Sequence, residues 1–485
     1  MDNFDLKSIK KRSIKSVLAL STRTVFLQLI NFIGYFFITV FLGKKEFGLF
    51  ILVSAMIDIL AYFSDVGLAA ALVQKKEEPT TKEIRSTFTI QQILVLLLLV
   101  LIFILSPLIK QFYNLDKAGM MLVYSFSLAF FLSSLKTIPS VLLERKLQFN
   151  KIIIPQFVET ISFNLIIIIL AWKGWGIKSY TLAVLARSFL GTAVLYFIAP
   201  WKIGLNFSFK VLKRLLKFGV PYQMNTFLAV VKDKFMILLL ARIIGSEGVA
   251  LVGWAEKWAT MPLRYFLDNT IKVAFPSFAR LQHDKEKLKI AIEKVLYFLS
   301  FLIIPSLTGI VIIAKPLIEI IPRYLKWQPA LIPLFLYCFA SAWGALAVFL
   351  TTIFNAIGRI KTTFKLMVLW TVLTWLFTPY LAVKFGFLGV AVGTVLVNLS
   401  SFIAIFIVKK YVKFNFSSQV LGPLSASLVM FVLISWLKKY LILNLATTII
   451  IIIILSIFIY MGIIILVNKR KLKEEAGFLY KELKS

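Results

Sequence analysis

Long apolar stretches separated by short polar breaks recur along the whole chain. Runs such as Ile166–Leu170 and Ile449–Leu455 hold only aliphatic residues. A helix needs about 20 apolar residues to cross the hydrocarbon core of a bilayer, and fourteen stretches of this kind follow one another here. Barrel strands would show about ten residues of alternating polarity, which these uniform runs lack. The pattern therefore predicts an all-α integral membrane protein with fourteen transmembrane helices.

Gly, Pro and charged residues mark most of the breaks, as in Gly43-Lys44-Lys45 and Lys384-Phe385-Gly386. We interpret the first apolar segment as a retained span, because it is longer than the apolar region of a signal peptide. The predicted spans are 16–41, 47–73, 87–109, 118–143, 152–172, 178–199, 212–241, 248–279, 291–314, 328–355, 362–383, 387–408, 418–437 and 441–467.

The composition supports lipid as the solvent. Of the 485 residues, 60% are hydrophobic and 15% aromatic, and the mean hydropathy is +0.90, whereas a soluble domain carries about 45–50% apolar residues. The single cysteine, Cys338, excludes an intrachain disulfide. The single histidine, His283, excludes histidine-based catalysis and a histidine-cluster metal site. We expect neither a metal nor a cofactor.

Basic residues divide unequally between the two ends of the predicted spans. The termini and the loops on their side hold 34 of the 55 Lys and Arg residues, and the opposite loops hold 13. Positive charge stays cytoplasmic, so we expect a multi-pass protein of the cell (inner or plasma) membrane with both termini in the cytoplasm. The net charge of +33 then reflects topology. A nucleic-acid partner is not expected, because no soluble basic face exists.

The remaining charges lie inside the predicted spans, where each costs at least about 2.5–3.5 kcal/mol if it faces lipid. They must pair with one another or line a cavity that water can enter. The basic ones are Arg23, Lys136, Arg187, Lys232, Lys234, Lys257, Arg264 and Lys272, and the acidic ones are Asp58, Asp65, Glu159, Asp233, Glu256 and Asp268.

The eighth span carries the clearest pattern. On a wheel of 100° per residue, Lys257, Arg264, Asp268 and Lys272 form one stripe. Asp268 lies four residues from both Arg264 and Lys272, so a ladder of ion pairs is one interpretation. The other is a cationic cavity wall that receives an anionic group. The predicted substrate-binding cations are Arg23, Lys232, Lys234, Lys257, Arg264 and Lys272.

Four carboxylates inside the spans are candidates for carrying a coupling proton or cation: Glu159, Asp233, Glu256 and Asp268. Pairing with a neighbouring lysine is the alternative that we favour for Asp233 and Glu256. Glu159 has no cation within one helical turn in the sequence, which makes it the better coupling candidate.

Weak internal similarity indicates a duplication. Leu42–Leu49 resembles Ile244–Leu251, and Ala171–Gly176 resembles Ala382–Phe387, at offsets of 202 and 211 residues. The matches suggest two six-helix lobes around a central cavity plus two extra helices, an arrangement typical of alternating access. The predicted parts are residues 1–199 (spans one to six), 200–410 (spans seven to twelve) and 411–485 (the last two spans and a basic tail).

Several segments resemble a known family. Leu42-Gly43, Phe47-Gly48-Leu49-Phe50 and Phe63–Gln74 are similar to the second-span signature of bacterial polysaccharide flippases, and Leu143–Phe149 and Asn355–Arg359 resemble the family's short cytoplasmic loops. The family is the polysaccharide-transporter branch, with Wzx-type members for O-antigen and colanic-acid-like polymers, of the multidrug/oligosaccharidyl-lipid/polysaccharide exporter superfamily. The resemblance covers essentially the whole chain.

The resemblance implies translocation of a polyprenyl-diphosphate-linked oligosaccharide from the cytoplasmic to the outer leaflet, for surface polysaccharide such as lipopolysaccharide. Arg23 resembles, by position only, a basic first-span residue of related lipid-diphosphate flippases. The partners we expect are the lipid-linked oligosaccharide, H⁺ or Na⁺ as the coupling ion, and polysaccharide polymerase machinery.

Other classes of membrane protein fit less well. A major-facilitator transporter usually has twelve spans and a Gly- and Arg-rich loop after the second, where this chain has Gln74–Pro79. A drug exporter of the same superfamily favours cations, which a positive cavity opposes. A membrane polymerase or ligase would carry paired acids on a large outer loop, but the longest such loop, near 314–328, holds only Glu319. We therefore predict a transporter and not an enzyme.

Overall fold

The computed structural model describes residues 26–438, 440 and 444–484, and within these ranges the chain is helical, with no strand. Eleven helical stretches of this part are long and apolar enough to cross a membrane, and Phe26–Phe41 is a shorter apolar helix. The predicted all-α membrane fold is confirmed.

Two of the eleven stretches are too long for one crossing. Thr226–Leu281 has 56 residues and Ile360–Tyr411 has 52, so each would extend about 80 Å as a single helix, against a hydrocarbon core of about 30 Å. Each is broken by a glycine with positive φ, at Gly245 (70°) and Gly386 (59°). Glycine adopts this conformation at little cost. Counted as two crossings each, and together with Phe26–Phe41, they account for the fourteen predicted spans.

The contacts divide the chain into two compact units, Met1–Ala250 and Leu251–Ser485. The boundary lies five residues after Gly245, and the three-part division expected from the sequence stays a prediction.

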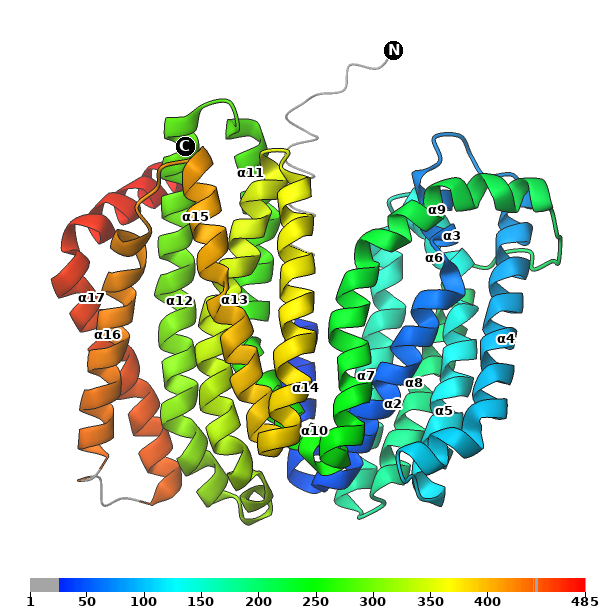
Figure 1. Ribbon diagram of the computed structural model, residues 1–485, viewed down its shortest axis with the longest axis horizontal. Helices are drawn as coiled ribbons and strands as arrows, with labels where there is room; N and C mark the ends of the chain where they lie inside the picture. Colours follow the sequence, from blue (N-terminus) through cyan, green and yellow to red (C-terminus); the bar gives the residue numbers. More distant parts are fainter. Residues whose placement is uncertain (1–25, 439, 441–443, 485) are drawn as a thin grey trace. The chain divides into compact units, whose positions relative to one another are not determined.

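The first unit is a bundle of helices, coloured from blue to green in Figure 1. Beyond Phe26–Phe41, its elements are α2 (Lys44–Asp65), α3 (Leu68–Gln74), α4 (Thr81–Phe112), α5 (Lys117–Ser134), α6 (Thr137–Arg145), α7 (Phe149–Trp172), α8 (Ile177–Ile198), α9 (Phe209–Val230), the π-helix η1 (Val231–Phe235) and the first part of α10 (Met236–Pro262).

The second unit continues α10 and runs to the C-terminus. Its further elements are the π-helix η2 (Leu263–Leu267), α11 (Asp268–Leu281), α12 (Lys285–Ile320), the 3₁₀-helix η3 (Pro322–Ala330), α13 (Leu331–Ala356), α14 (Ile360–Leu399), α15 (Ser401–Tyr411), α16 (Phe416–Leu437) and α17 (Leu445–Lys484).

A buried carboxylate attaches α9 to the first unit. Glu83 accepts hydrogen bonds from the Thr80 main-chain N–H (2.7 Å) and from Lys75 (3.1 Å), and it forms an ion pair with Arg214 of α9. Thr80 and Glu83 together form a capping box at the start of α4, which satisfies two N–H groups that have no partner inside the helix. Glu83 thereby joins the α3–α4 loop to α9, which leads into η1.

Arg145, in a segment that carries the family resemblance, closes the end of α3. Its guanidinium donates to the main-chain oxygens of Leu72 (2.6 Å), Lys75 (2.7 Å) and Glu77 (2.8 Å). The last carbonyl groups of a helix have no partner within it, and the planar guanidinium offers several donors in a fixed geometry. The loop after the second span is therefore held by a residue from the loop after the fourth.

Candidate functional site

Two π-helices lie at the charged positions of consecutive spans. The segment η1 contains Lys232, Asp233 and Lys234, and η2 contains Arg264. A π-helix uses i→i+5 hydrogen bonds and is rare, and single turns of it inside α-helices are frequent at functional sites. The two π-helices therefore contain residues that the charge pattern of the sequence had already marked as site candidates.

The charges of η1 have partners inside the first unit. Lys232 lies 3.4 Å from Asp233, and Lys234 lies 2.5 Å from Asp58 of α2. Both acidic side chains are at least half exposed (59% and 50%). Pairing of Asp233 with a neighbouring lysine, the alternative favoured above, is observed. Asp58 had no role in the sequence-based site, because it lies 176 residues from Lys234.

Reciprocal hydrogen bonds fix α9 against α2 near this ion pair. The Tyr62 hydroxyl donates to the main-chain oxygen of Gln223 (2.5 Å), and the Gln223 amide nitrogen donates to the main-chain oxygen of Tyr62 (2.7 Å). The η1 cations therefore belong to a contact between α2 and the α9–η1 segment, and Lys234 contributes to that contact through Asp58.

Glu159 also has a partner, 23 residues away. The Lys136 ammonium, at the junction of α5 and α6, lies 2.5 Å from the carboxylate of Glu159 in α7, and both side chains are about four-fifths buried. The carboxylate lies against Gly191 of α8, where any Cβ would collide with it. The pair is thus enclosed by three segments of the first unit. Its role as a coupling site stays a prediction.

The stripe in the second unit is arranged differently. Arg264, Asp268 and Lys272 are all exposed, and none of them makes an ion pair with a described residue. The ladder of ion pairs considered from the sequence therefore does not form in this structure. Glu256 is exposed and Lys257 is half-buried on the preceding α10.

The π-helix explains why Arg264 and Asp268 do not pair, whereas Asp268 and Lys272 both lie in the regular helix α11. Pro262 has no N–H to donate, and η2 begins at the next residue. Side chains four residues apart stack in an α-helix, but the i→i+5 pattern removes that alignment for Arg264 and Asp268. It also rotates the later part of the helix by roughly 100° relative to a regular wheel. The stripe drawn on that wheel was therefore wrong in its angles.

The exposed side chain of Arg264 lies at a depth in the membrane where a charge needs a polar environment. It lies 19 residues after the break at Gly245 and 17 before the end of α11 at Leu281, and so near the middle of its span. A cation at this depth is costly against hydrocarbon, so the guanidinium must reach water or a polar ligand. Lys272 lies closer to the helix end, where a lysine can extend to the interface. Arg23 lies outside the described residues.

The chain is similar in sequence to proteins of surface polysaccharide biosynthesis. The chain is 24% identical over 366 residues to the lipopolysaccharide biosynthesis protein WzxC of Escherichia coli strain K12, covering 74% of this chain and 73% of that protein. It is 26% identical over 345 residues to an uncharacterized membrane protein in the cps region of Klebsiella pneumoniae, covering 69% of each.

Among solved structures, the fold is similar to that of a lipid II flippase MurJ in an inward closed conformation, with a TM-score of 0.76, 18% identity, and coverage of 94% of this chain and 100% of that one. The solved structure is named as a flippase, which agrees with the prediction of a transporter that is not an enzyme. A family model described as polysaccharide biosynthesis protein matches residues 37–330. That match covers more than half of the sequence, and the chain belongs to this polysaccharide biosynthesis protein family.

Proposed function

We propose that the protein is an alternating-access flippase that moves a polyprenyl-diphosphate-linked oligosaccharide from the cytoplasmic to the outer leaflet during surface polysaccharide biosynthesis. Family membership, the names of the relatives and the fold shared with a lipid II flippase support a lipid-linked substrate. Such a substrate carries a diphosphate, sugars and a hydrocarbon tail, and only the diphosphate requires cations within the membrane.

One observation carries the diphosphate part of the proposal: Arg264 is an exposed guanidinium near the middle of a span, with no ion-pair partner among the described residues. A guanidinium can bind phosphate oxygens through two parallel hydrogen bonds. It is also always charged, so its binding capacity does not depend on the local pH. We therefore assign the principal phosphate contact to Arg264.

The other predicted cations have secondary roles in this proposal. Lys232 and Lys234 would have to leave Asp233 and Asp58 to bind an anion, which makes their contact weaker and easily reversed. Lys257 and Lys272 add positive charge along the same span as Arg264. Transport requires release as well as binding, and a few spread cations release a ligand more readily than one tight cluster.

Translocation in proteoliposomes tests the proposal. A fluorescent polyprenyl-diphosphate-linked oligosaccharide would be placed in one leaflet, and its arrival in the other would be followed with a membrane-impermeant quencher. We expect Arg264→Ala to slow translocation about tenfold or more, because it removes charge-assisted hydrogen bonds worth about 1.5–3 kcal/mol, and Arg264→Lys to restore part of the rate. Arg280→Ala, which removes an exposed arginine near the end of α11, is the matched control.

Two results would contradict the proposal. Wild-type rates in Arg264→Ala would exclude its phosphate role, and absence of translocation by the wild-type protein with any lipid diphosphate would exclude the function. A comparison of polyprenyl diphosphate with polyprenyl monophosphate as competitors separates the two. Only the diphosphate should inhibit strongly, and the difference should shrink in Arg264→Ala.

We infer from the 34-to-13 distribution of basic residues that both termini lie in the cytoplasm and that the protein resides in the inner or plasma membrane. Reporter fusions at the two termini test this orientation, and a periplasmic or extracellular signal from either would contradict it.

Energy coupling through H⁺ or Na⁺ is part of the same proposal. Glu159, Asp233, Glu256 and Asp268 are the candidate carboxylates; Asp268, four residues after Arg264, is exposed and makes no ion pair with a described residue. Translocation should respond to an imposed pH or Na⁺ gradient across the proteoliposome membrane. The translocated product is the expected substrate of a polysaccharide polymerase.

A further inference from the structure

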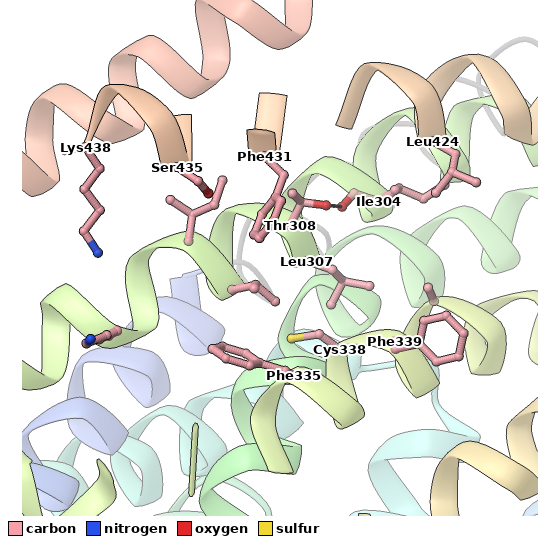
Figure 2. A pocket seen from close by; sticks show the side chains of 14 residues that line it. Ile304, Leu307, Thr308, Phe335, Cys338, Phe339, Leu424, Phe431, Ser435 and Lys438 are labelled. Atoms are coloured by element: carbon pink, nitrogen blue, oxygen red, sulfur yellow. Dashed lines mark hydrogen bonds between the residues drawn. The ribbon is translucent and has the colours of Figure 1, made fainter. Parts of the chain in front are cut away.

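A groove in the second unit has a composition unlike that of the charged spans. The helices α12, α13 and α16 enclose a cavity of about 570 Å³, shown in Figure 2. Its wall is formed mainly by aliphatic and aromatic side chains, including Leu307 and Val311 of α12, Phe335 and Phe339 of α13, and Phe431 of α16. Phe339 is 51% exposed and Phe335 is 38% exposed, so the groove is open along part of its length.

The groove is about as long as one leaflet of a bilayer. Along α12 it runs from Ile304 to Lys315, which at 1.5 Å per residue is about 16 Å. The hydrocarbon core of a bilayer is about 30 Å thick, so this length is close to half of it. Along α16 the lining residues extend from Leu424 to Lys438, about 21 Å.

The two lysines of the lining lie at the same end. Lys315 is in the last two turns of α12, and Lys438 directly follows α16. Figure 2 shows Lys438 at one end of the groove and Leu424 at the other. A neighbouring carboxylate, Glu319, lies 3.8 Å from Lys315. The end of the groove therefore carries two positive charges against one negative charge, and the rest of the wall carries none.

We propose that this groove binds an anionic phospholipid, with the phosphate at Lys315 and Lys438 and one acyl chain along α12 and α16. An apolar channel of single-leaflet length with cations at its interfacial end matches the shape and charge of such a lipid. The polyprenyl tail of a transported substrate is a different occupant, and the experiment below separates the two. The site is independent of the proposed transport function, because the lipid would be a bound component of the second unit.

Native mass spectrometry of the full-length protein in detergent tests this site. The protein would be incubated with phosphatidylglycerol or phosphatidylcholine carrying identical acyl chains. Each lysine near an anionic lipid surface favours binding by about fivefold, and Glu319 offsets part of this. We therefore expect phosphatidylglycerol to be retained about fivefold or more over phosphatidylcholine.

Variants of the lining residues test whether the preference for phosphatidylglycerol arises in the groove. The double variant Lys315→Gln, Lys438→Gln should remove the preference for phosphatidylglycerol and leave the binding of the two lipids equal. The matched control is Lys173→Gln, Lys178→Gln, which removes two exposed lysines from the first unit and should behave like the wild type. Ala342→Phe, which fills the groove, should reduce retention of both lipids.

Three outcomes would overturn the proposal. The first is equal retention of the two lipids by the wild-type protein, and the second is an unchanged preference in the Lys315→Gln, Lys438→Gln variant, which would leave the lysines as interfacial anchors only. The third is displacement of phosphatidylglycerol by an equimolar amount of polyprenyl monophosphate, which would assign the groove to the substrate's tail. The lysine variants lie at helix ends, so a folded double variant is expected, and its elution as a single species checks this.

Discussion

The π-helices η1 and η2 occupy consecutive spans and both carry cations, but their surroundings differ. Around η1, each lysine is within 4 Å of a carboxylate, one in the same segment and one on α2. Around η2, Arg264 and the two charged residues that follow it on α11 make no ion pair with a described residue. The first unit contains a further paired charge of this kind, because it also encloses the Lys136–Glu159 ion pair.

This difference separates charges that hold helices together from charges that are available to a ligand. Removing two ions from water is costly, and mutual attraction with good geometry compensates for that cost. The first unit uses long-range pairs in this way, between α2 and η1 and between the α5–α6 junction and α7. The exposed charges on η2 and α11 have no such compensation, so a water-accessible surface or an anionic substrate must provide it.

The largest effect, a loss of translocation, should come from variants of the unpaired residues Arg264 and Asp268. If Arg264 bound Asp268 for structural reasons, the double variant Arg264→Ala, Asp268→Ala would regain the transport lost in Arg264→Ala. We expect the double variant to stay at least about tenfold below the wild type, because the phosphate ligand is still missing. The measurement is translocation in proteoliposomes at matched protein content. Recovery to near the wild-type rate would show that Asp268 is the functional partner.

A smaller but clear effect is expected on stability in the first unit. Lys136→Ala leaves Glu159 enclosed without a cation, and we expect a loss of about 2–3 kcal/mol, somewhat below the range for fully buried pairs because both side chains retain some exposure. The double variant Lys136→Met, Glu159→Gln should recover most of it. The thermal unfolding midpoint in detergent is the measurement, and equal midpoints for the single variant and the wild type would contradict the pairing.

The Asp58–Lys234 pair should contribute less, because both side chains are 38–50% exposed. We expect Asp58→Asn to cost about 1 kcal/mol or less, and the exchange Asp58→Lys, Lys234→Asp to restore stability. A double-mutant cycle on unfolding midpoints measures the coupling. No coupling energy would mean that the hydrogen bonds between Tyr62 and Gln223 hold α9 on α2 without help from the ion pair.

The smallest effect on stability is expected at Arg264 and Asp268, which do not form an ion pair in this structure. Arg264→Gln and Asp268→Asn should each change the free energy of unfolding by less than about 0.5 kcal/mol, as for substitutions away from packed contacts. A cycle of the two should show no coupling. A coupling energy comparable to that of Lys136 and Glu159 would mean that the two residues form a pair in the conformation that dominates in solution.

The span pattern could be predicted from the sequence because the hydrocarbon core imposes it on every segment separately. Each crossing must be apolar and must satisfy its own backbone hydrogen bonds, so the apolar run alone identifies it. The breaks at Gly245 and Gly386 follow from the same local logic, since glycine is the residue that adopts positive φ at little cost. Lys232, Lys234 and Arg264 were found as candidates for a similar reason, because a charge inside a span is visible in the sequence.

Only the tertiary structure decided which charged side chains form ion pairs and in which direction each one points from its helix. Glu159 has no cation within one helical turn in the sequence, yet Lys136 reaches it across the contact between two helices. Asp58 reaches Lys234 from 176 residues away, and no local pattern records which helices will be neighbours. The angles of Arg264, Asp268 and Lys272 depend on the i→i+5 hydrogen bonds of η2, which a regular wheel does not contain. The sequence thus determined which residues lie in the membrane, because burial in lipid is a property of each segment. The fold determined which charges are paired, because an ion pair requires two segments to be placed within 4 Å of each other.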